Sequence, residues 1–205
     1  MCQPTENTRV FQRIEQMFIK NDMITLRCAE PEDAEQIFQW ENDRDIWRVS
    51  GTHTPYSHFQ IEQFLLSNND LPSQKQLRLM IDLTKNGQTI GCIDIYDYDA
   101  FNSRAGLGIL IDKDFRQQGY AKAALALCVE YLFHDVLLHQ VYCSIDETNT
   151  ESQQLFLRQG FELCGQRKEW LKTTEGFLDV LEYQLVTKIN AGSAPPLKGN
   201  CFYEV

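Results

Sequence analysis

The sequence predicts a single α/β (α+β) domain with a mixed, mostly antiparallel central sheet of about six to seven strands flanked by helices. Three observations lead to this fold class. Segments with apolar residues at every second position, as in strands, alternate with segments of helical period. Asn86 and Gly87 separate two such alternating segments, which is a strong hairpin signal. In the second half a strand, a helix and a strand follow one another, which implies a right-handed crossover in a mixed sheet.

The domain opens with a strand followed by a helix. Residues 23–28 alternate between apolar and polar side chains, as expected of a strand with one buried face. Pro31 then begins an acidic segment, residues 31–43, in which Ile37 and Trp40 belong to one apolar stripe. Proline at the start and acidic residues in the first turn are typical of a helix N-terminus.

A loop and a second helix come next. Residues 47–56 lack a periodic pattern and are expected to form a loop. Ser57 with Gln60 has the spacing of a capping box, in which each side chain satisfies a backbone N–H group at the start of a helix. The helix predicted after it carries the apolar residues Ile61 and Leu65.

Three strands in the middle of the domain are expected to form a meander. Residues 77–84 and 89–98 flank the Asn-Gly turn and should pair antiparallel. Residues 105–112 alternate in the same way after a polar turn, so they form the third strand.

The second half begins with a long helix and ends in strands. Residues 119–138 carry apolar side chains at three-residue and four-residue intervals, as in a helix that packs on a sheet. Residues 140–146 form a strand, and residues 151–159 form a short helix that ends at a glycine. Residues 161–170 and 177–186 are the last two strands.

The two ends of the chain differ from the domain in composition. The domain is expected to span residues 22–188, with a polar N-terminal extension at 1–21 and a C-terminal tail at 189–205. The N-terminus lacks the basic and apolar plan of a signal peptide, and no apolar segment is long enough to span a bilayer. We therefore expect a cytoplasmic protein without a membrane partner.

Charge and cysteine content exclude several kinds of site. The net charge of −10 disfavours nucleic acid, because such partners are bound through Lys and Arg. The seven cysteines include no Cys-x-x-Cys pair, and no histidine lies at zinc-ligand spacing, so no metal is expected. Four cysteines lie in apolar runs and are expected to behave as small core residues: Cys28, Cys92, Cys128 and Cys143.

The segment most informative about chemistry joins the third meander strand to the long helix. The first turn of a helix leaves backbone N–H groups unpaired and carries partial positive charge, so it binds phosphate oxygens. Gly119 would let the backbone approach a phosphate closely, and Arg116 would add a charge. The segment lacks the Gly-Lys-Ser/Thr ending of a nucleotide P-loop and the three glycines of a dinucleotide fingerprint. A different phosphate ligand is therefore expected.

Two motifs resemble those of the GCN5-related N-acetyltransferases, the GNAT family. The run Arg-Gln-Gln-Gly-Tyr-Ala at residues 116–121 is similar to the family's Arg/Gln-x-x-Gly-x-Gly/Ala pyrophosphate loop. Residues 149–161 are similar to its Asn-x-x-Ala/Ser helix, which ends in a Gly-Phe pair. The opening strand and helix also match, so the resemblance covers nearly all of residues 23–186. The pattern looks nearest to the branch of spermidine and ribosomal-protein N-terminal acetyltransferases.

The resemblance implies an acetyl-CoA-dependent N-acetyltransferase in which a primary amine attacks the thioester directly. It also implies which residues contact acetyl-CoA. Backbone groups of one strand would bind the pantetheine arm, the loop would bind the pyrophosphate, and the short helix would line the far side. These residues are, in that order, Ile109, Leu110 and Ile111; Arg116, Gln117, Gln118, Gly119, Tyr120 and Ala121; and Asn149, Ser152 and Arg158.

The resemblance leaves the proton donor and the general base less defined. Many relatives protonate the leaving thiolate with a tyrosine of the short helix, but Phe156 stands at the matching position. Ser152 is the best substitute, although a serine there is equally expected to start the helix. For the base, Asp94 and Tyr96 lie on one face of the strand that normally faces the acceptor, and Asp94 is preferred.

Three functions stay open within this reading. A small-molecule amine of polyamine type is preferred as acceptor, although spermidine enzymes tend to carry a glutamate where Gly106 stands here. A protein N-terminal amine is the alternative, favoured by Ser152. A non-catalytic acyl-CoA-binding module is the third, because of Phe156. His53 and His58 belong to the loop that often covers the acceptor and are candidates for substrate contact. Assembly into a homo-oligomer also stays open.

Overall fold

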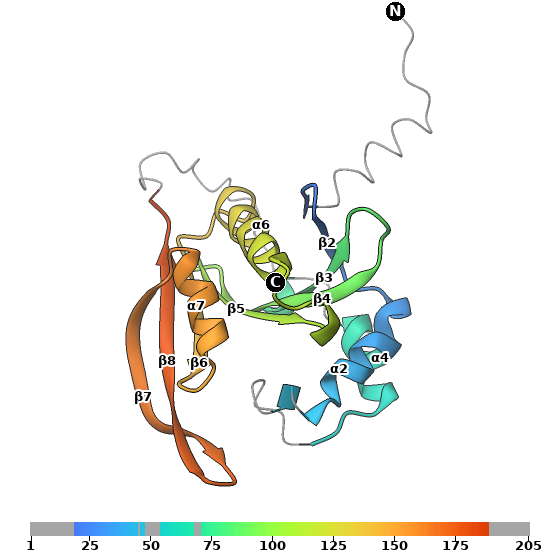
Figure 1. Cartoon of the computed structure of the whole chain (residues 1–205). Coiled ribbons are helices and arrows are strands. Elements are labelled where there is room, and N and C mark those ends of the chain that lie inside the picture. Colours follow the sequence, from blue (N-terminus) through green and yellow to red (C-terminus); the bar gives the residue numbers. More distant parts are fainter. Residues whose placement is uncertain (1–18, 45, 48–53, 68–70, 189–205) are drawn as a thin grey trace, which may run out of the picture.

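The computed structural model describes residues 19–44, 46–47, 54–67 and 71–188, and an eight-stranded sheet lies at its centre (Figure 1). The strands lie in the order β1-β2-β3-β4-β5-β6-β8-β7. Their bounds are β1 Ile19–Lys20, β2 Ile24–Cys28, β3 Leu77–Leu83, β4 Thr89–Asp99, β5 Arg104–Ile111, β6 Gln140–Asp146, β7 Glu162–Thr173 and β8 Gly176–Val186. The neighbours are antiparallel except β5 and β6, which are parallel. The predicted mixed, mostly antiparallel sheet is therefore confirmed.

Helices connect and cover these strands. Their bounds are η1 Pro31–Asp33, a 3-10 turn; α2 Ala34–Glu41; α4 His58–Ser67; α5 Leu71–Gln74; η2 Lys113–Phe115, a 3-10 turn; α6 Tyr120–His134; and α7 Thr150–Arg158. The predicted helices and strands are all present. Three short elements were not predicted, β1, α5 and η2, because each is too short to leave a periodic pattern. β1 pairs with β2 and adds residues of the expected N-terminal extension to the sheet edge.

The long helix α6 ends earlier than the sequence pattern predicts. Leu137 has a φ of 62°, in the left-handed region, and the Leu138 N–H donates to the Leu132 carbonyl at 2.9 Å. A left-handed residue followed by such a bond closes a helix C-terminus. The apolar residues after His134 continue the periodic pattern, but they follow this closure rather than extending the helix.

Two local predictions are confirmed at the level of single hydrogen bonds. The Ser57 N–H donates to Gln60 Oε1 at 2.8 Å, and the Gln60 N–H donates to Ser57 Oγ at 3.2 Å, so the capping box forms. In the turn between β3 and β4, Gly87 has a φ of 70° and its N–H donates to the Leu83 carbonyl at 2.8 Å. Both signals depend on contacts between residues close in sequence, which is why the sequence reveals them.

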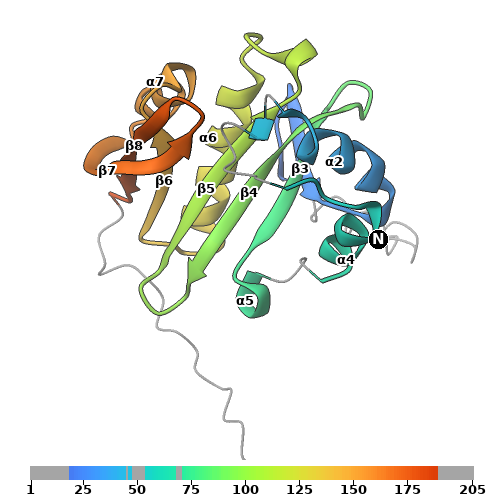
Figure 2. The same ribbon diagram turned by 90° about the horizontal axis from the view of Figure 1, so that it is seen from below.

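Two hydrophobic layers cover opposite faces of the sheet. Ile93 and Leu107 belong to the larger core, together with Leu125 of α6. Cys92 belongs to the second core, together with Ile37 of α2. Because successive strand residues point to opposite faces, β4 contributes to both layers. Figures 1 and 2 show α6 on one side of the sheet and the pair α2 and α4 on the other.

Three of the four cysteines predicted to be core residues are buried, and the fourth is not. Cys92, Cys128 and Cys143 are buried, and burial raises the pKa of the Cys92 and Cys128 thiols to about 12. Cys28 is exposed, so the prediction is wrong for this residue. It shares a strand face with the buried Leu26 but is the last residue of β2, at the end of the pairing with β3.

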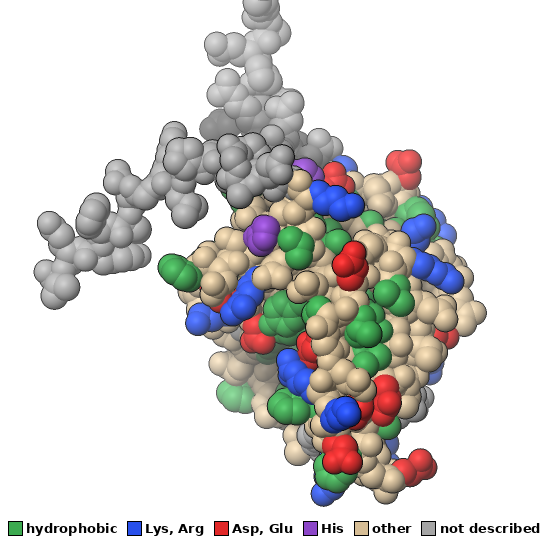
Figure 3. Space-filling view, turned by 90° about the vertical axis from the view of Figure 1, so that its left-hand side faces the viewer, with side chains coloured by type: hydrophobic (Ala, Val, Ile, Leu, Met, Phe, Trp, Pro, Cys, Tyr) green, Lys and Arg blue, Asp and Glu red, His purple; other side chains and the backbone are tan. Residues whose placement is uncertain are grey.

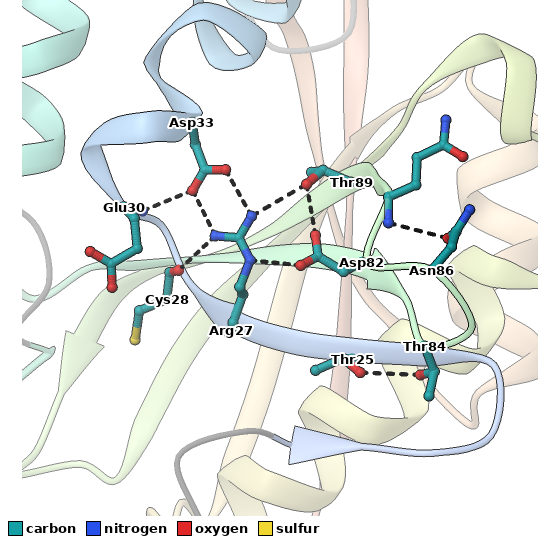
Figure 4. Close-up of polar contacts among 10 residues, drawn as sticks. Thr25, Arg27, Cys28, Glu30, Asp33, Asp82, Thr84, Asn86 and Thr89 are labelled. Carbon is teal, nitrogen blue, oxygen red and sulfur yellow. Dashed lines mark hydrogen bonds and ion pairs between the residues drawn. The ribbon is translucent and has the colours of Figure 1, made fainter. Parts of the chain in front are cut away.

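An ion network ties β2 to β3, β4 and η1 (Figure 4). Arg27 Nε donates to Asp82 Oδ2 at 2.6 Å, and its terminal nitrogens donate to the two oxygens of Asp33 at 2.7 and 2.8 Å. Asp82 also accepts from Thr89 Oγ1 at 2.8 Å. Burial acts to raise the pKa of Asp33, but the bonds from Arg27 and from the Glu30 N–H outweigh it and hold this pKa below its ordinary value.

Replacing Arg27 by methionine is expected to destabilise the fold by about 3 kcal/mol, because the buried carboxylates of Asp33 and Asp82 lose their cation. The lowered pKa of Asp33 adds stability above the pKa of an unfolded aspartate, about 4, and this stability is lost as the pH falls through the folded value. Urea unfolding at neutral and at acid pH measures both effects. Lys168→Met, at an exposed position, is the control. An equal loss in the two variants would contradict this account.

β7 forms an exposed edge of the sheet. All its residues are exposed or half-buried, including Leu163 and Trp170. Figure 3 views the molecule from this side, where hydrophobic side chains are interspersed with charged ones. The pairing of β7 with β8 shifts register twice. Register shifts and charged side chains such as Arg167 and Lys168 hinder an edge from adding a further strand.

Candidate active site

The sheet opens between β5 and β6. The pairing of these two strands ends at Gly106 and Tyr142. Beyond this point, the described part of the chain gives β5 no strand partner on its β6 side. The predicted pantetheine-binding residues Ile109, Leu110 and Ile111 lie on this part of β5. The stretch therefore offers an unpaired strand edge to an extended ligand.

The loop after β5 leads directly into the start of α6. Arg116 follows η2, and its Nε donates to the Ile111 carbonyl at 2.9 Å, which fixes the loop against the end of β5. Gln117 and Gly119 have φ values of 59° and 87°, so the chain turns sharply before Tyr120 begins the helix. The N-cap residue is Gly119, which has no side chain to accept a hydrogen bond from the first N–H groups of the helix. The first N–H groups of α6 therefore stay available to a ligand.

These features fit a phosphate group. Exposed N–H groups at a helix start, together with the partial positive charge there, bind phosphate oxygens. A Cβ atom built on Gly119 would meet no atom within 4 Å, so the space beside this residue is open. The residues predicted to hold the pyrophosphate all lie at this helix start: Arg116, Gln117, Gln118, Gly119, Tyr120 and Ala121.

Asn149 and Ser152 differ in their hydrogen bonding at the start of the short helix α7. Asn149 is the N-cap, since its Oδ1 accepts from the Ser152 N–H at 3.1 Å. Ser152 is half-buried, and its hydroxyl has no hydrogen-bond partner among the described residues. Two roles were left open for Ser152, proton donor and helix start. Asn149 rather than Ser152 caps the helix, so the second role belongs to Asn149. Arg158 lies exposed in the last turn of the same helix.

Phe156 of α7 is a core residue. Its side chain is 2% exposed and packs edge-to-face on Phe161, with ring centroids 4.9 Å apart. A phenylalanine carries no acidic proton. Phe156 therefore cannot supply a proton to a leaving thiolate.

The sheet face on the side of α2 and α4 carries the other predicted catalytic residues. Asp94 and Tyr96 both line a cavity of about 240 Å³ beside Arg78 on this face. Arg78 donates to the two oxygens of Asp94 at 2.6 and 2.9 Å and contacts Glu41 Oε1 at 2.7 Å. Both oxygens of Asp94 are thus engaged by a cation. An ammonium group that approached Asp94 would have to compete with Arg78.

The position of Tyr96 explains the glycine at position 106. A Cβ atom on Gly106 would lie 2.1 Å from the Tyr96 ring, so a glutamate of the kind expected in spermidine enzymes would require this ring to move. The same ring meets Tyr142 of β6 edge-to-face, with centroids 6.0 Å apart. Burial raises the pKa of the Tyr96 phenol well above its ordinary value, so the phenol stays protonated and able to donate a hydrogen bond.

The residues of this face that the sequence reasoning missed include Glu182 and Ser144, besides Arg78 and Glu41. Glu182 of β8 lies opposite Ser144 of β6, whose hydroxyl donates to Glu182 Oε2 at 2.9 Å. A glutamate among the apolar residues of a late strand was a visible signal. Glu182 lies near the opening between β5 and β6 only because β8 lies between β6 and β7, however. This strand order could not be predicted from the sequence pattern.

Of the two histidines expected to contact substrate, His53 and His58, the structure describes His58. His53 lies outside the described residues. His58 is exposed and stacks on Phe38, with ring centroids 3.6 Å apart and planes 14° apart. His58 therefore supports the contact between α4 and α2.

The sequence matches the acetyltransferase (GNAT) domain family over residues 23–162. The chain belongs to the GNAT family. The predicted reaction class, an acetyl-CoA-dependent N-acetyltransferase, is confirmed by this match and by relatives that are N-acetyltransferases. Spermidine N(1)-acetyltransferase of Escherichia coli (strain K12) is 24% identical over 143 residues, which are 70% of this chain and 75% of the relative.

Solved structures share the fold of this GNAT enzyme. Spermidine N-acetyltransferase from Vibrio cholerae, in complex with CoA and spermine, has a TM-score of 0.74 at 21% identity, covering 81% of this chain and 96% of that one. Ribosomal-protein-S5-alanine acetyltransferase from Vibrio fischeri has a TM-score of 0.74 at 15% identity, covering 84% and 97%. At these identities the likeness establishes the fold alone.

Two findings concern metal and membrane contacts. Within the described ranges, no group of three or more His, Cys, Asp and Glu side chains is placed to hold a metal ion. In the same part of the chain, no helix is both long and apolar enough to cross a membrane.

Proposed function

We propose that this GNAT enzyme transfers the acetyl group of acetyl-CoA to a small, polyamine-like primary amine. The observation that carries the proposal is the opening between β5 and β6, which leads from an unpaired strand edge to the uncapped start of α6. A pantetheine arm has the extended shape that adds to a strand edge, and a pyrophosphate suits a helix start. The strand edge of β5 is followed along the chain by the start of α6, just as the pantetheine arm of CoA is joined directly to its pyrophosphate.

In this proposal the chain binds and positions three parts of the cosubstrate. Residues 109–111 hydrogen-bond the pantetheine arm through their backbone, and residues 116–121 hold the pyrophosphate. Asn149, Ser152 and Arg158 line the far side. The cosubstrate supplies an activated acetyl group, and the protein gains most of the rate by holding the amine and the thioester in reacting geometry.

Ser152 is the proposed proton donor to the departing thiolate. Its hydroxyl has no other partner among the described residues, and Phe156, at the alternative position on α7, has no proton to give. Tyr96 and Asp94 line the acceptor side in this proposal. Tyr96 acts there as a hydrogen-bond donor, because its phenol stays protonated.

The acceptor class rests on charge and kinship. Carboxylates of three elements, Glu41, Asp94 and Glu182, lie on the face that carries the cavity, and negative charge attracts a cationic amine. Kinship with spermidine acetyltransferases supports the polyamine class. A peptide N-terminus is the second candidate. It is favoured by the Ser152 hydroxyl, which has no hydrogen-bond partner among the described residues, and by the structural likeness to ribosomal-protein-S5-alanine acetyltransferase.

Release of free CoA thiol from acetyl-CoA, measured across a panel of acceptors, tests the proposal. The panel contains spermidine, spermine, aminoglycosides, amino acids and short peptides with free N-termini. We expect turnover with the polyamines. Turnover confined to the peptides would transfer the assignment to the second candidate, and acetyl-CoA binding without turnover on any amine would identify a non-catalytic binding module.

A further inference from the structure

The carboxylates of Glu41, Asp94 and Glu182 lie on the acceptor face, the sheet face on the side of α2 and α4, and they differ in how fully they are paired. Arg78 binds both oxygens of Asp94 and one oxygen of Glu41, at distances from 2.6 to 2.9 Å. Arg78 is thus the ion-pair partner of both Asp94 and Glu41. Glu182 is the third, and its two oxygens are unequally used.

One oxygen of Glu182 is buried and accepts no hydrogen bond. Oε2 accepts from the Ser144 hydroxyl at 2.9 Å. Oε1 has no hydrogen-bond donor among the described residues, and Arg167 Nε, 3.1 Å away, is its ion-pair partner. Arg167 is half exposed, and its guanidinium also lies over the Trp170 ring. Leaving a buried acceptor without a hydrogen-bond donor is unfavourable, so such an atom suggests that a ligand supplies the donor.

Glu182 lies near the opening between β5 and β6, on β8, which pairs with the far side of β6. Its partner Ser144 comes two residues after Tyr142, where the pairing of β5 and β6 ends. The Tyr96 phenol reaches across Gly106 from β4 and lies near both the Ser144 backbone and the Glu182 carboxylate. An amine in this opening would therefore meet Glu182 without displacing Arg78.

We propose that Glu182 Oε1 binds the ammonium group of the acceptor and takes its proton. This inference rests on the proposed function. The ammonium gives one proton to Glu182, and the neutral nitrogen forms a bond to the acetyl carbonyl carbon as the carbon–sulfur bond breaks. The Ser152 hydroxyl gives its proton to the thiolate and regains one from the second proton of the nitrogen, and Glu182 later returns its own proton to water.

The charged and titratable groups that face Glu182 come from three strands. Arg167 belongs to β7, Tyr142 to β6 and Tyr96 to β4. Cys164 of β7 contacts the Glu182 backbone carbonyl, and Cys143 of β6 lies in the core on the opposite face. Arg167 is the cation of this set, and it is the side chain that would turn away when an ammonium group binds.

The test compares Glu182→Gln with Glu175→Gln, an exposed glutamate at the turn of the same hairpin. We expect kcat/KM for the amine to fall about 100-fold in Glu182→Gln at neutral pH, the usual loss when a general base is removed. The deficit should shrink as the pH approaches the pKa of a free amine, about 10, because a neutral amine needs no base. Acetyl-CoA affinity should match that of the wild type, and Glu175→Gln should be fully active.

A deficit that stays constant across pH, or full activity of Glu182→Gln, would overturn the role of Glu182. If Asp94→Asn instead showed the deficit that closes at high pH, the base would be Asp94. A wild-type protein that acetylates no amine would overturn the proposed function itself, and the inference with it. Glu182→Asp, which keeps a carboxylate, should recover part of the activity at neutral pH.

Discussion

Replacing Gly119 by leucine is expected to weaken acetyl-CoA binding by about 100-fold, the loss of roughly 3 kcal/mol or two charge-assisted hydrogen bonds. Gly119 has a φ of 87° and forms the N-cap of α6, with open space beside it. A leucine side chain would fill the space in which the pyrophosphate meets the first N–H groups of the helix. Titration calorimetry with acetyl-CoA measures the loss directly.

Gly87→Leu is the matched control for this substitution. Gly87 has a φ of 70° and, like Gly119, would place its Cβ within 4 Å of no other atom. Both variants therefore carry the same backbone penalty of about 1–2 kcal/mol for a side chain in the left-handed region. We expect similar losses of thermal stability but normal acetyl-CoA affinity in Gly87→Leu. Unchanged affinity in Gly119→Leu would show that the phosphate site is elsewhere.

Replacing Gly106 by alanine is expected to lower kcat/KM for the amine about 100-fold, the usual result of displacing a positioned group by about 1 Å. The new Cβ would lie 2.1 Å from the Tyr96 ring, so the ring must move and its hydroxyl must leave the Ser144 backbone. The contact involves the far end of a side chain, so we expect a loss of stability of only about 1 kcal/mol. Steady-state kinetics and thermal unfolding separate the two effects.

Gly108→Ala is the control on the same face of the same strand. Its Cβ would meet Asp94 Cβ at 3.9 Å and the Tyr96 ring at 4.0 Å, which are ordinary contacts. We expect this variant to keep the arrangement of Asp94 and Tyr96 and most of the activity. Equal losses in Gly106→Ala and Gly108→Ala would contradict the role assigned to the Tyr96 ring.

The sequence predicted most of the fold because its signals are local. The capping box of Ser57 and Gln60, the Asn-Gly turn and the alternating strands depend on residues near one another in the chain. The phosphate loop was predictable for the same reason, since Arg116 and Gly119 adjoin the helix that they precede. Cys28 was assigned to the core wrongly, because alternation shows which face a residue lies on but not whether the strand end is covered.

The acceptor side could not be predicted equally well, because it is built from distant segments. The ion pair of Arg78 with Asp94 joins β3 to β4, and its third member, Glu41, comes from α2. The contact of Glu182 with Ser144 needs β8 to lie beside β6, and the close approach of Tyr96 to Gly106 needs the register of β4 on β5. Pairing and register of this kind arise from the folded sheet as a whole.

The central claim, that this GNAT enzyme moves an acetyl group from acetyl-CoA to a primary amine, is tested most directly by following the acetyl carbon. Acetyl-CoA labelled with carbon-13 in the acetyl group is incubated with the protein and spermidine, and the products are observed by NMR. The account predicts an N-acetyl amide signal that grows in equal amount with free CoA thiol. Labelled acetyl-CoA that binds and stays intact, or that yields only acetate, would contradict it.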